Sequence, residues 1–270
     1  MSSFLDLLKI YQWALPASVV MATVLALIGG QWTARAKSTQ IFVLGQGSSL
    51  GIVLGFVLNL ILGTDFHSLN LILGLCLGWI TLLISDFWIE SRADRNHIYL
   101  TLFVFFLSLT YLITSITPAL ESHMAAAYFG DIAVMSDKAA QMSLVAGAAF
   151  GAFLFWRWQE LSMISFQLVN HSFIHRNHRN KIFDIGTLIL TTVAVQSMGY
   201  LYTMGSLFIA TSFASLRSKN LQSYTTKVVV IASLGSVLGF AVSLASTELP
   251  TVPCILIGQM LIGFLSYTKK

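Results

Sequence analysis

Long apolar stretches alternate with short polar ones along the whole chain. The apolar stretches cover residues 14–33, 40–63, 68–89, 98–118, 139–159, 183–202, 204–216, 226–246 and 253–268. A helix needs about 20 mostly apolar residues to cross a bilayer, and most of the stretches are that long. The seventh and ninth are shorter, and the seventh could be a half-helix that enters and leaves the membrane without crossing it. The pattern therefore predicts an all-α, polytopic transmembrane helical bundle of about 8–9 spans.

Composition supports this interpretation. Hydrophobic residues make up 56% of the chain and charged residues only 10%, whereas soluble domains carry about 25% charged residues. The two cysteines, Cys76 and Cys254, lie in separate apolar runs, which argues against a disulfide framework and against a cysteine metal cluster. No linker or repeat interrupts the chain, so we expect residues 1–270 to form a single transmembrane domain.

Basic and acidic residues fall in alternate loops. One set of loops carries Arg35, Lys37, Arg92, Arg95, Arg157, Arg176, Arg179, Lys181, Arg217, Lys219, Lys227, Lys269 and Lys270. The other set carries Asp65, Glu121, Asp131, Asp137 and Glu248, with Lys138 as its only base. Loops rich in lysine and arginine stay in the cytoplasm, so we expect the first set to be cytoplasmic and the second to lie outside. The net charge of +4 is then loop charge that sets orientation, and it predicts no nucleic-acid partner.

The most polar segment, residues 167–181, lies between the fifth and sixth apolar stretches. Its three histidines, His171, His175 and His178, share one face if the segment is helical. Three imidazoles on one face could bind a transition metal. A basic, solvated segment between two spans is the simpler interpretation and would dock on a partner protein, and we favour docking.

A second group of candidate ligands lies in the loops expected outside the membrane. The group consists of Asp65, His67, Glu121, His123 and Asp131. Oxygen and imidazole ligands suit zinc or manganese, so these residues could guide a cation toward the entrance of a passage. The alternative is the ordinary polarity of exposed loops.

Ionisable residues are rare inside the apolar stretches, where charge is costly and often functional. Asp184 opens the sixth stretch, where capping of the helix N-terminus is its simplest role. The polar residues that remain as candidates for lining a substrate pathway are uncharged: Gln46, Ser48, Ser49, Asn59, Gln196 and Thr211. Such a path would bind a bare divalent cation weakly.

Four short motifs, in chain order, resemble the family of zinc, manganese and iron ABC importer permeases. They are Phe129-Gly130-Asp131-Ile132, the run Leu161-Ser162-Met163-Ile164-Ser165-Phe166, Gly205-Ser206-Leu207, and Leu249-Pro250-Thr251 followed by Pro253. The resemblance implies a type II importer fold in the bacterial cytoplasmic (inner) membrane. It also implies a homodimer, cytoplasmic ABC ATPase subunits that bind the ATP, a periplasmic or lipoprotein metal-binding protein, and no covalently bound cofactor.

The same resemblance makes residues 167–181 the cytoplasmic segment that couples the permease to its ATPase, and we call them the coupling segment. The residues that would form this contact are Gln167, His171, His175, Arg176, His178 and Arg179. The chain itself has no G-x-x-x-x-G-K-[ST] motif for phosphate binding, so ATP hydrolysis is expected in the partner and the chain is not expected to be an enzyme.

Two positions depart from the family pattern. The family carries an aspartate and, four residues on, a histidine that are thought to contact the metal; Phe42 and Gln46 stand there in this chain. An ABC-type permease for a non-metal solute is therefore the alternative function. A membrane di-iron hydroxylase or desaturase is less favoured, because such sites need several histidine boxes. Outside the coupling segment, the remaining histidines, His67, His97 and His123, are scattered over both predicted faces.

Overall fold

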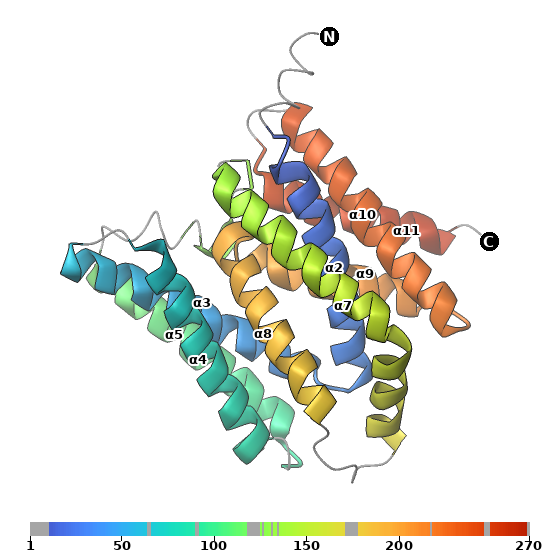
Figure 1. Ribbon diagram of the computed structural model, residues 1–270, viewed down its shortest axis with the longest axis horizontal. Helices are drawn as coiled ribbons and strands as arrows, with labels where there is room; N and C mark the ends of the chain where they lie inside the picture. Colours follow the sequence, from blue (N-terminus) through green and yellow to red (C-terminus); the bar gives the residue numbers. More distant parts are fainter. Residues whose placement is uncertain are drawn as a thin grey trace. The chain divides into compact units, whose positions relative to one another are not determined.

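The computed structural model describes residues 11–63, 66–89, 92–117, 125, 127–130, 132–133, 135–170, 178–216, 218–245 and 249–268. Within these ranges all regular elements are helices, which confirms the all-α fold class. The helices are α2 (Ala14–Ala34), α3 (Ser38–Leu62), α4 (His67–Ile84), the π-helix η1 (Ser85–Ile89), α5 (Arg95–Ile116), α7 (Asp137–Asn170), α8 (His178–Met198), α9 (Tyr200–Ser215), α10 (Leu221–Ala245) and α11 (Thr251–Thr268) (Figure 1).

Seven described helices are long and apolar enough to cross a membrane. They are Ala14–Ala34, Ser38–Leu62, Ser68–Ile89, Arg95–Ile116, Asp137–Ser165, Lys181–Met198 and Leu221–Ala245. The seventh and ninth predicted stretches form the short helices α9, of 16 residues, and α11, of 18. A polytopic membrane protein with about the expected number of spans is thereby confirmed.

Several helix boundaries differ from the predicted ones by a few residues, and two of the differences have a clear local cause. α7 continues to Asn170, beyond the predicted end at residue 159, because neither glycine nor proline follows Gly151 before that point. The break between the sixth and seventh stretches lies at Gly199, which has a positive φ of 89°.

The helices form two compact units. The α10 unit contains residues 1–31, 131–162 and 201–270, and the α3 unit contains residues 32–130 and 163–200. Boundaries fall inside α2 and α7 and after Tyr200, the first residue of α9, so each of these helices contributes to both units. The interpretation of residues 1–270 as one domain stays a prediction.

In the α3 unit, α3 packs against α4, α5 and α8 (Figure 1). Small residues at helical spacing on α3 bring it close to α4: a Cβ added to Gly51 would lie only 2.3 Å from the Leu73 carbonyl oxygen. Such stripes let helices approach each other in lipid, where apolar burial supplies no driving force between them. The stripe therefore packs helices and does not line a pore.

In the α10 unit, α10 packs along α11. Gly239 of α10 lies so close to α11 that an added Cβ would be 2.3 Å from the Cys254 carbonyl oxygen. A buried cluster of small and branched side chains joins α2, α9 and α10; its members are Ala26, Ala210, Ala214, Val228, Ile231 and Ala232. Gln259 of α11 donates a hydrogen bond to Ser236 of α10 over 3.1 Å.

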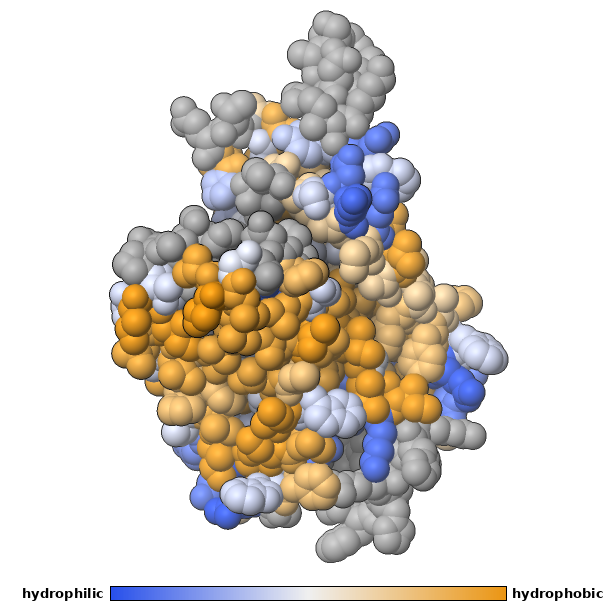
Figure 2. Space-filling model, turned by 60° about the vertical axis from the view of Figure 1, so that its left-hand side comes forward, coloured by the Kyte–Doolittle hydropathy of each residue, from blue (hydrophilic) through white to orange (hydrophobic). Residues whose placement is uncertain are grey.

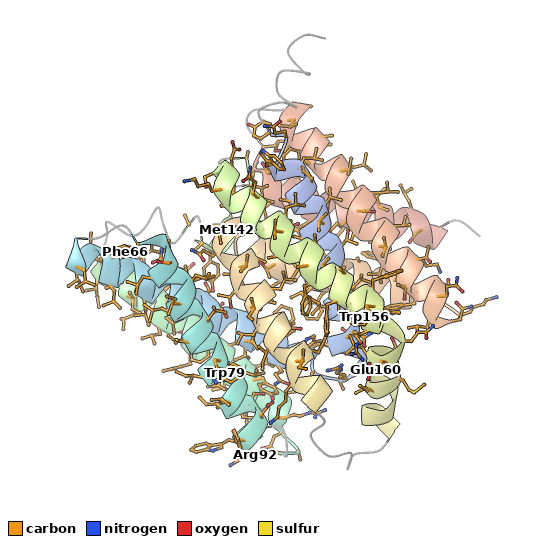
Figure 3. All side chains as sticks on the ribbon, in the orientation of Figure 1. Phe66, Trp79, Arg92, Met142, Trp156 and Glu160 are labelled. Atoms are coloured by element: carbon orange, nitrogen blue, oxygen red, sulfur yellow. The ribbon has the colours of Figure 1, made fainter. Side chains whose placement is uncertain are left out.

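The surface carries large apolar side chains, as a lipid-facing protein requires. Figure 2 shows hydrophobic residues over most of one face, with hydrophilic residues toward its margins. Trp79, Met142 and Trp156 are exposed side chains on helices long and apolar enough to cross a membrane (Figure 3), and Trp156 is 79% exposed. In lipid, exposed apolar side chains on such helices would contact acyl chains and not water.

Candidate functional site

Most of the ligands proposed from the loops lie outside the described residues. This holds for Asp65, Glu121, His123, Asp131, His171, His175 and Arg176, and for the side chains of His67, Gln167, His178 and Arg179. In the part of the chain that the structure describes, no group of three or more His, Cys, Asp and Glu side chains could hold a metal ion. The outer ligand group and the coupling contacts therefore stay predictions.

Gln46, one of the predicted pathway residues, is fully buried on α3 and is oriented by a phenol. The hydroxyl of Tyr128 donates a hydrogen bond to Gln46 Oε1 over 2.7 Å, and Gln46 Nε2 has no hydrogen-bond partner among the described residues. Burial raises the pKa of Tyr128 to about 12, although the hydrogen bond to Gln46 acts in the opposite direction. Tyr128 is therefore neutral at physiological pH and acts as a donor.

Tyr128 is held over α3 by an unusually close backbone contact. Gly130 and Gly199 both have positive φ, of 69° and 89°, and a Cβ added to Gly130 would lie 1.8 Å from the Met198 carbonyl oxygen. Only glycine fits a left-handed position with a backbone so near. The Phe129-Gly130 motif thus packs on the junction between α8 and α9.

A second phenol joins the two elements. The ring of Tyr200 at the start of α9 lies 5.4 Å from that of Tyr128, centroid to centroid. The Tyr200 hydroxyl donates to the Phe42 carbonyl oxygen on α3 over 3.3 Å. Phe42 and Gln46, the positions that the sequence resemblance pairs with the family's aspartate and histidine, are thus in contact with two neutral phenols. Neither tyrosine was predicted from the sequence; the only signal was that Tyr200 directly follows Gly199 and Tyr128 lies two residues before Gly130.

The other pathway candidates have different surroundings. Ser48 accepts a hydrogen bond from Thr192 of α8 over 3.0 Å, so it contributes to helix packing. Ser49, three residues after Gln46 and on the same face of α3, is fully buried, and its hydroxyl has no hydrogen-bond partner among the described residues. Gln196 is partly buried on α8. Thr211 lies in the α10 unit, where its hydroxyl donates to the Phe208 carbonyl oxygen of its own helix.

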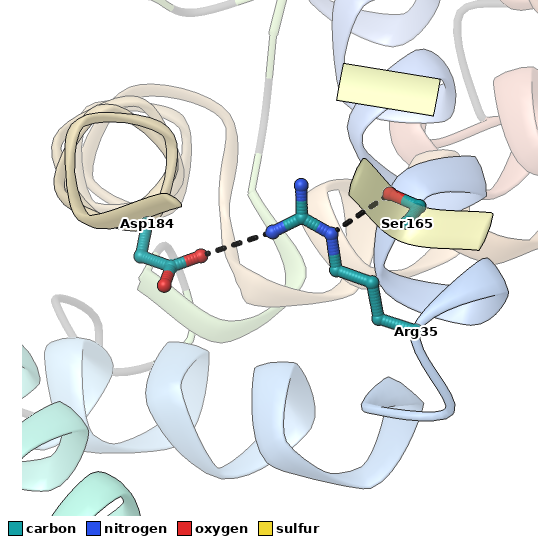
Figure 4. Close-up of polar contacts among 3 residues, drawn as sticks. All are labelled: Arg35, Ser165 and Asp184. Carbon is teal, nitrogen blue, oxygen red and sulfur yellow. Dashed lines mark hydrogen bonds and ion pairs between the residues drawn. The ribbon is translucent and has the colours of Figure 1, made fainter. Parts of the chain in front are cut away.

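A largely buried ion pair in the α3 unit includes Asp184, which follows the coupling segment in the sequence. Arg35 Nη1 lies 3.5 Å from Asp184 Oδ1, and Arg35 Nε donates to Ser165 Oγ over 2.9 Å (Figure 4). The sequence suggested that Asp184 caps the N-terminus of a helix. This prediction is wrong, because α8 already begins at His178. Burial lowers the pKa of the Arg35 guanidinium and Asp184 raises it. An arginine stays protonated in such surroundings, so the pair is ionic.

The sequence model of the ABC 3 transport family matches residues 8–270. The chain belongs to this family, which confirms the resemblance to its permeases that the motifs suggested. No curated protein matches the chain.

Solved structures share the fold. PsaBC from Streptococcus pneumoniae, solved in complex with Fab, contains a chain 20% identical to this one, with a TM-score of 0.76 over 98% of this chain and 95% of that one. A protein described as a metal-chelate type ABC transporter, in an inward-facing conformation, is 19% identical, with a TM-score of 0.71 over 97% of this chain and 88% of that one.

Proposed function

We propose that the chain is the membrane permease subunit of a bacterial ABC importer that carries a divalent metal ion, zinc or manganese in the first place, into the cytoplasm. The observation that carries the proposal is the family match over residues 8–270. The fold shared with a metal-chelate type ABC transporter supports it further. Two copies of the chain would bind two cytoplasmic ATPase subunits, and a periplasmic or lipoprotein metal-binding protein would deliver the ion.

In this proposal the chain performs no covalent chemistry and alternates between outward and inward openings. The outer acidic and histidine residues named above would attract the cation. The α3 face that bears Gln46 and Ser49 would form part of the passage, because each side chain is fully buried and has a polar atom without a partner among the described residues. Such an atom costs about 1–3 kcal/mol when it is left unpaired, and a passing hydrated ion would offset this cost.

The proposal is tested by metal uptake in cells. A strain that lacks this chain is compared with the same strain carrying it, in medium from which a chelator has removed free metal. We expect uptake of radioactive zinc or manganese to depend on the chain and on cellular ATP. Equal uptake of both metals by the two strains would contradict the proposal.

A second candidate function is an ABC-type permease for a non-metal solute. The observation that favours it is the neutral pair Gln46 and Tyr128, which offers an amide and a phenol where the family carries charged or imidazole ligands. Neutral groups of this kind suit a solute with hydrogen-bonding atoms better than a bare cation. Chain-dependent growth on an organic nutrient that persists in the presence of a strong chelator would favour this candidate over metal import.

A further inference from the structure

Arg35 occupies a fixed backbone position at the end of α2. The Ala36 amide donates to the Thr33 carbonyl oxygen and the Lys37 amide donates to the Trp32 carbonyl oxygen, each over 3.0 Å. With Ala36 at a φ of 55°, these two bonds form the Schellman arrangement that ends a helix. Arg35 is the last residue before that left-handed turn, so its backbone is fixed by two hydrogen bonds.

The side chain of Arg35 reaches two other helices at once. Its Nε donates to Ser165 on α7, its Nη1 pairs with Asp184 on α8, and its guanidinium carbon lies 4.5 Å from the ring centroid of Phe183 (Figure 4). The side chain is only 2% exposed. A planar guanidinium presents donors in several fixed directions, which a lysine ammonium cannot do.

The two helices joined in this way are the ones that flank the coupling segment. Ser165 lies just before residue 167, and Asp184 lies just after residue 181. We propose that Arg35 is a positioning residue for transport: it holds the end of α7 and the first turns of α8 together, so that a displacement of the coupling segment reaches the turn that starts α3. The inference rests on the proposed function, because it requires an ATPase that acts on this segment.

The connection onward from Arg35 is short and covalent. α3 begins at Ser38, and the helix then carries Phe42 and Gln46, whose surroundings are described above. Both ends of this link belong to the α3 unit. A movement of α7 and α8 at Arg35 would therefore tilt or rotate the helix that contributes Gln46 to the proposed passage.

Stability alone is a weak reason for this arrangement. A buried ion pair costs about as much in lost hydration as it gains in attraction, and well-packed apolar residues often replace it without loss. In addition, Arg35 Nη2 has no hydrogen-bond partner among the described residues, so the guanidinium is not fully satisfied. The arrangement suits a contact that can be remade between two states better than one that only stabilises the fold.

The chain contains a matched control on α7, the helix that carries Ser165. Arg157 Nη1 pairs with Glu160 Oε2 over 2.6 Å, one turn apart on α7, and both side chains are much more exposed than Arg35, at 41% and 28%. Both residues of this pair lie on α7. Arg157→Lys therefore tests the general effect of an arginine-to-lysine change in the protein without altering a contact between helices.

The experiment uses the permease purified with its ATPase and reconstituted in vesicles, with a saturating amount of its metal-binding protein and with zinc and manganese as probes. Three variants weaken the contacts among Arg35, Ser165 and Asp184 in different ways. Arg35→Lys keeps the positive charge but loses the planar guanidinium. Ser165→Ala removes the hydroxyl acceptor on α7, and Asp184→Asn removes the carboxylate charge that pairs with Arg35. ATP hydrolysis and metal uptake are measured on the same vesicles. We expect each variant to lower the metal carried per ATP about tenfold, the range found for coupling positions, with hydrolysis retained. The double variant Arg35→Lys, Ser165→Ala should carry as much metal per ATP as Arg35→Lys alone, because both changes remove the same contact.

The outcomes separate the inference from the proposed function. If the wild type carries metal and the three variants, like Arg157→Lys, keep the wild-type ratio of metal to ATP, Arg35 is not a positioning residue. If hydrolysis, uptake and the amount of folded complex all fall in proportion, its role is structural and the inference is wrong. If the wild type carries neither zinc nor manganese, the proposed function is wrong and the inference fails with it.

Discussion

The contact between Gly130 and the α8–α9 junction makes a quantitative prediction about stability. In Gly130→Ala, the added Cβ would lie 1.8 Å from the Met198 carbonyl oxygen, and the residue would also keep a φ of 69°. The left-handed backbone costs an L-residue about 1–2 kcal/mol. The close backbone cannot rotate away as a side chain would, and overpacking of this kind costs about 1–3 kcal/mol more. We therefore expect a loss of about 2–5 kcal/mol in total.

Gly63 provides the control that separates the two contributions. It has nearly the same backbone conformation, with a φ of 62°, but nothing lies within 4 Å of an added Cβ. Gly63→Ala should therefore lose only the backbone contribution, about 1–2 kcal/mol. The assay is thermal unfolding of the purified protein in one detergent. The decrease in midpoint for Gly130→Ala should be about twice that for Gly63→Ala or more. Equal decreases would refute the packing of the Phe129-Gly130 motif on Met198 and, with it, the placement of Tyr128 over Gln46.

Three further predictions follow from other parts of the chain. Ala36→Gly should stabilise the protein by about 1 kcal/mol, because glycine relieves the left-handed position at the end of α2; an unchanged or lower thermal midpoint would contradict the Schellman turn. Replacing the three histidines of the coupling segment together by glutamine should leave transport within a few-fold of normal and keep any inhibition of ATP hydrolysis by zinc. Loss of that inhibition would instead indicate a metal site, since neutral imidazoles are its ligands. A cysteine in place of Asn177 should not react with a reagent added outside intact cells, and efficient labelling would reverse the proposed orientation.

The spans and their packing could be predicted from the sequence because lipid imposes simple rules. A run of apolar residues at least 18 residues long reads as a crossing helix whatever its partners are. Likewise, the spacing of Gly47, Gly51 and Gly55 identifies a close helix contact from one helix alone. The short apolar stretches 204–216 and 253–268 likewise predicted that α9 and α11 would be short.

The polar contacts of the site could not be predicted, because each of them joins distant parts of the chain. Arg35 and Ser165 are 130 positions apart, and Gln46 and Tyr128 are 82 positions apart. Hydropathy places Arg35 and Asp184 near span ends, where snorkelling or capping is the simplest explanation. A faint signal was present: Ser162 and Ser165, one turn apart, interrupt the apolar run at the end of α7.

In the proposed function, this chain forms the pathway by which an ABC importer moves a divalent metal ion. The most direct test is metal uptake into vesicles that contain the purified permease–ATPase complex and a saturating amount of its binding protein. We expect accumulation of zinc or manganese inside the vesicles when ATP is supplied on the ATPase side, and none with a non-hydrolysable ATP analogue. ATP hydrolysis without accumulation of either metal, in vesicles shown to be sealed, would contradict it.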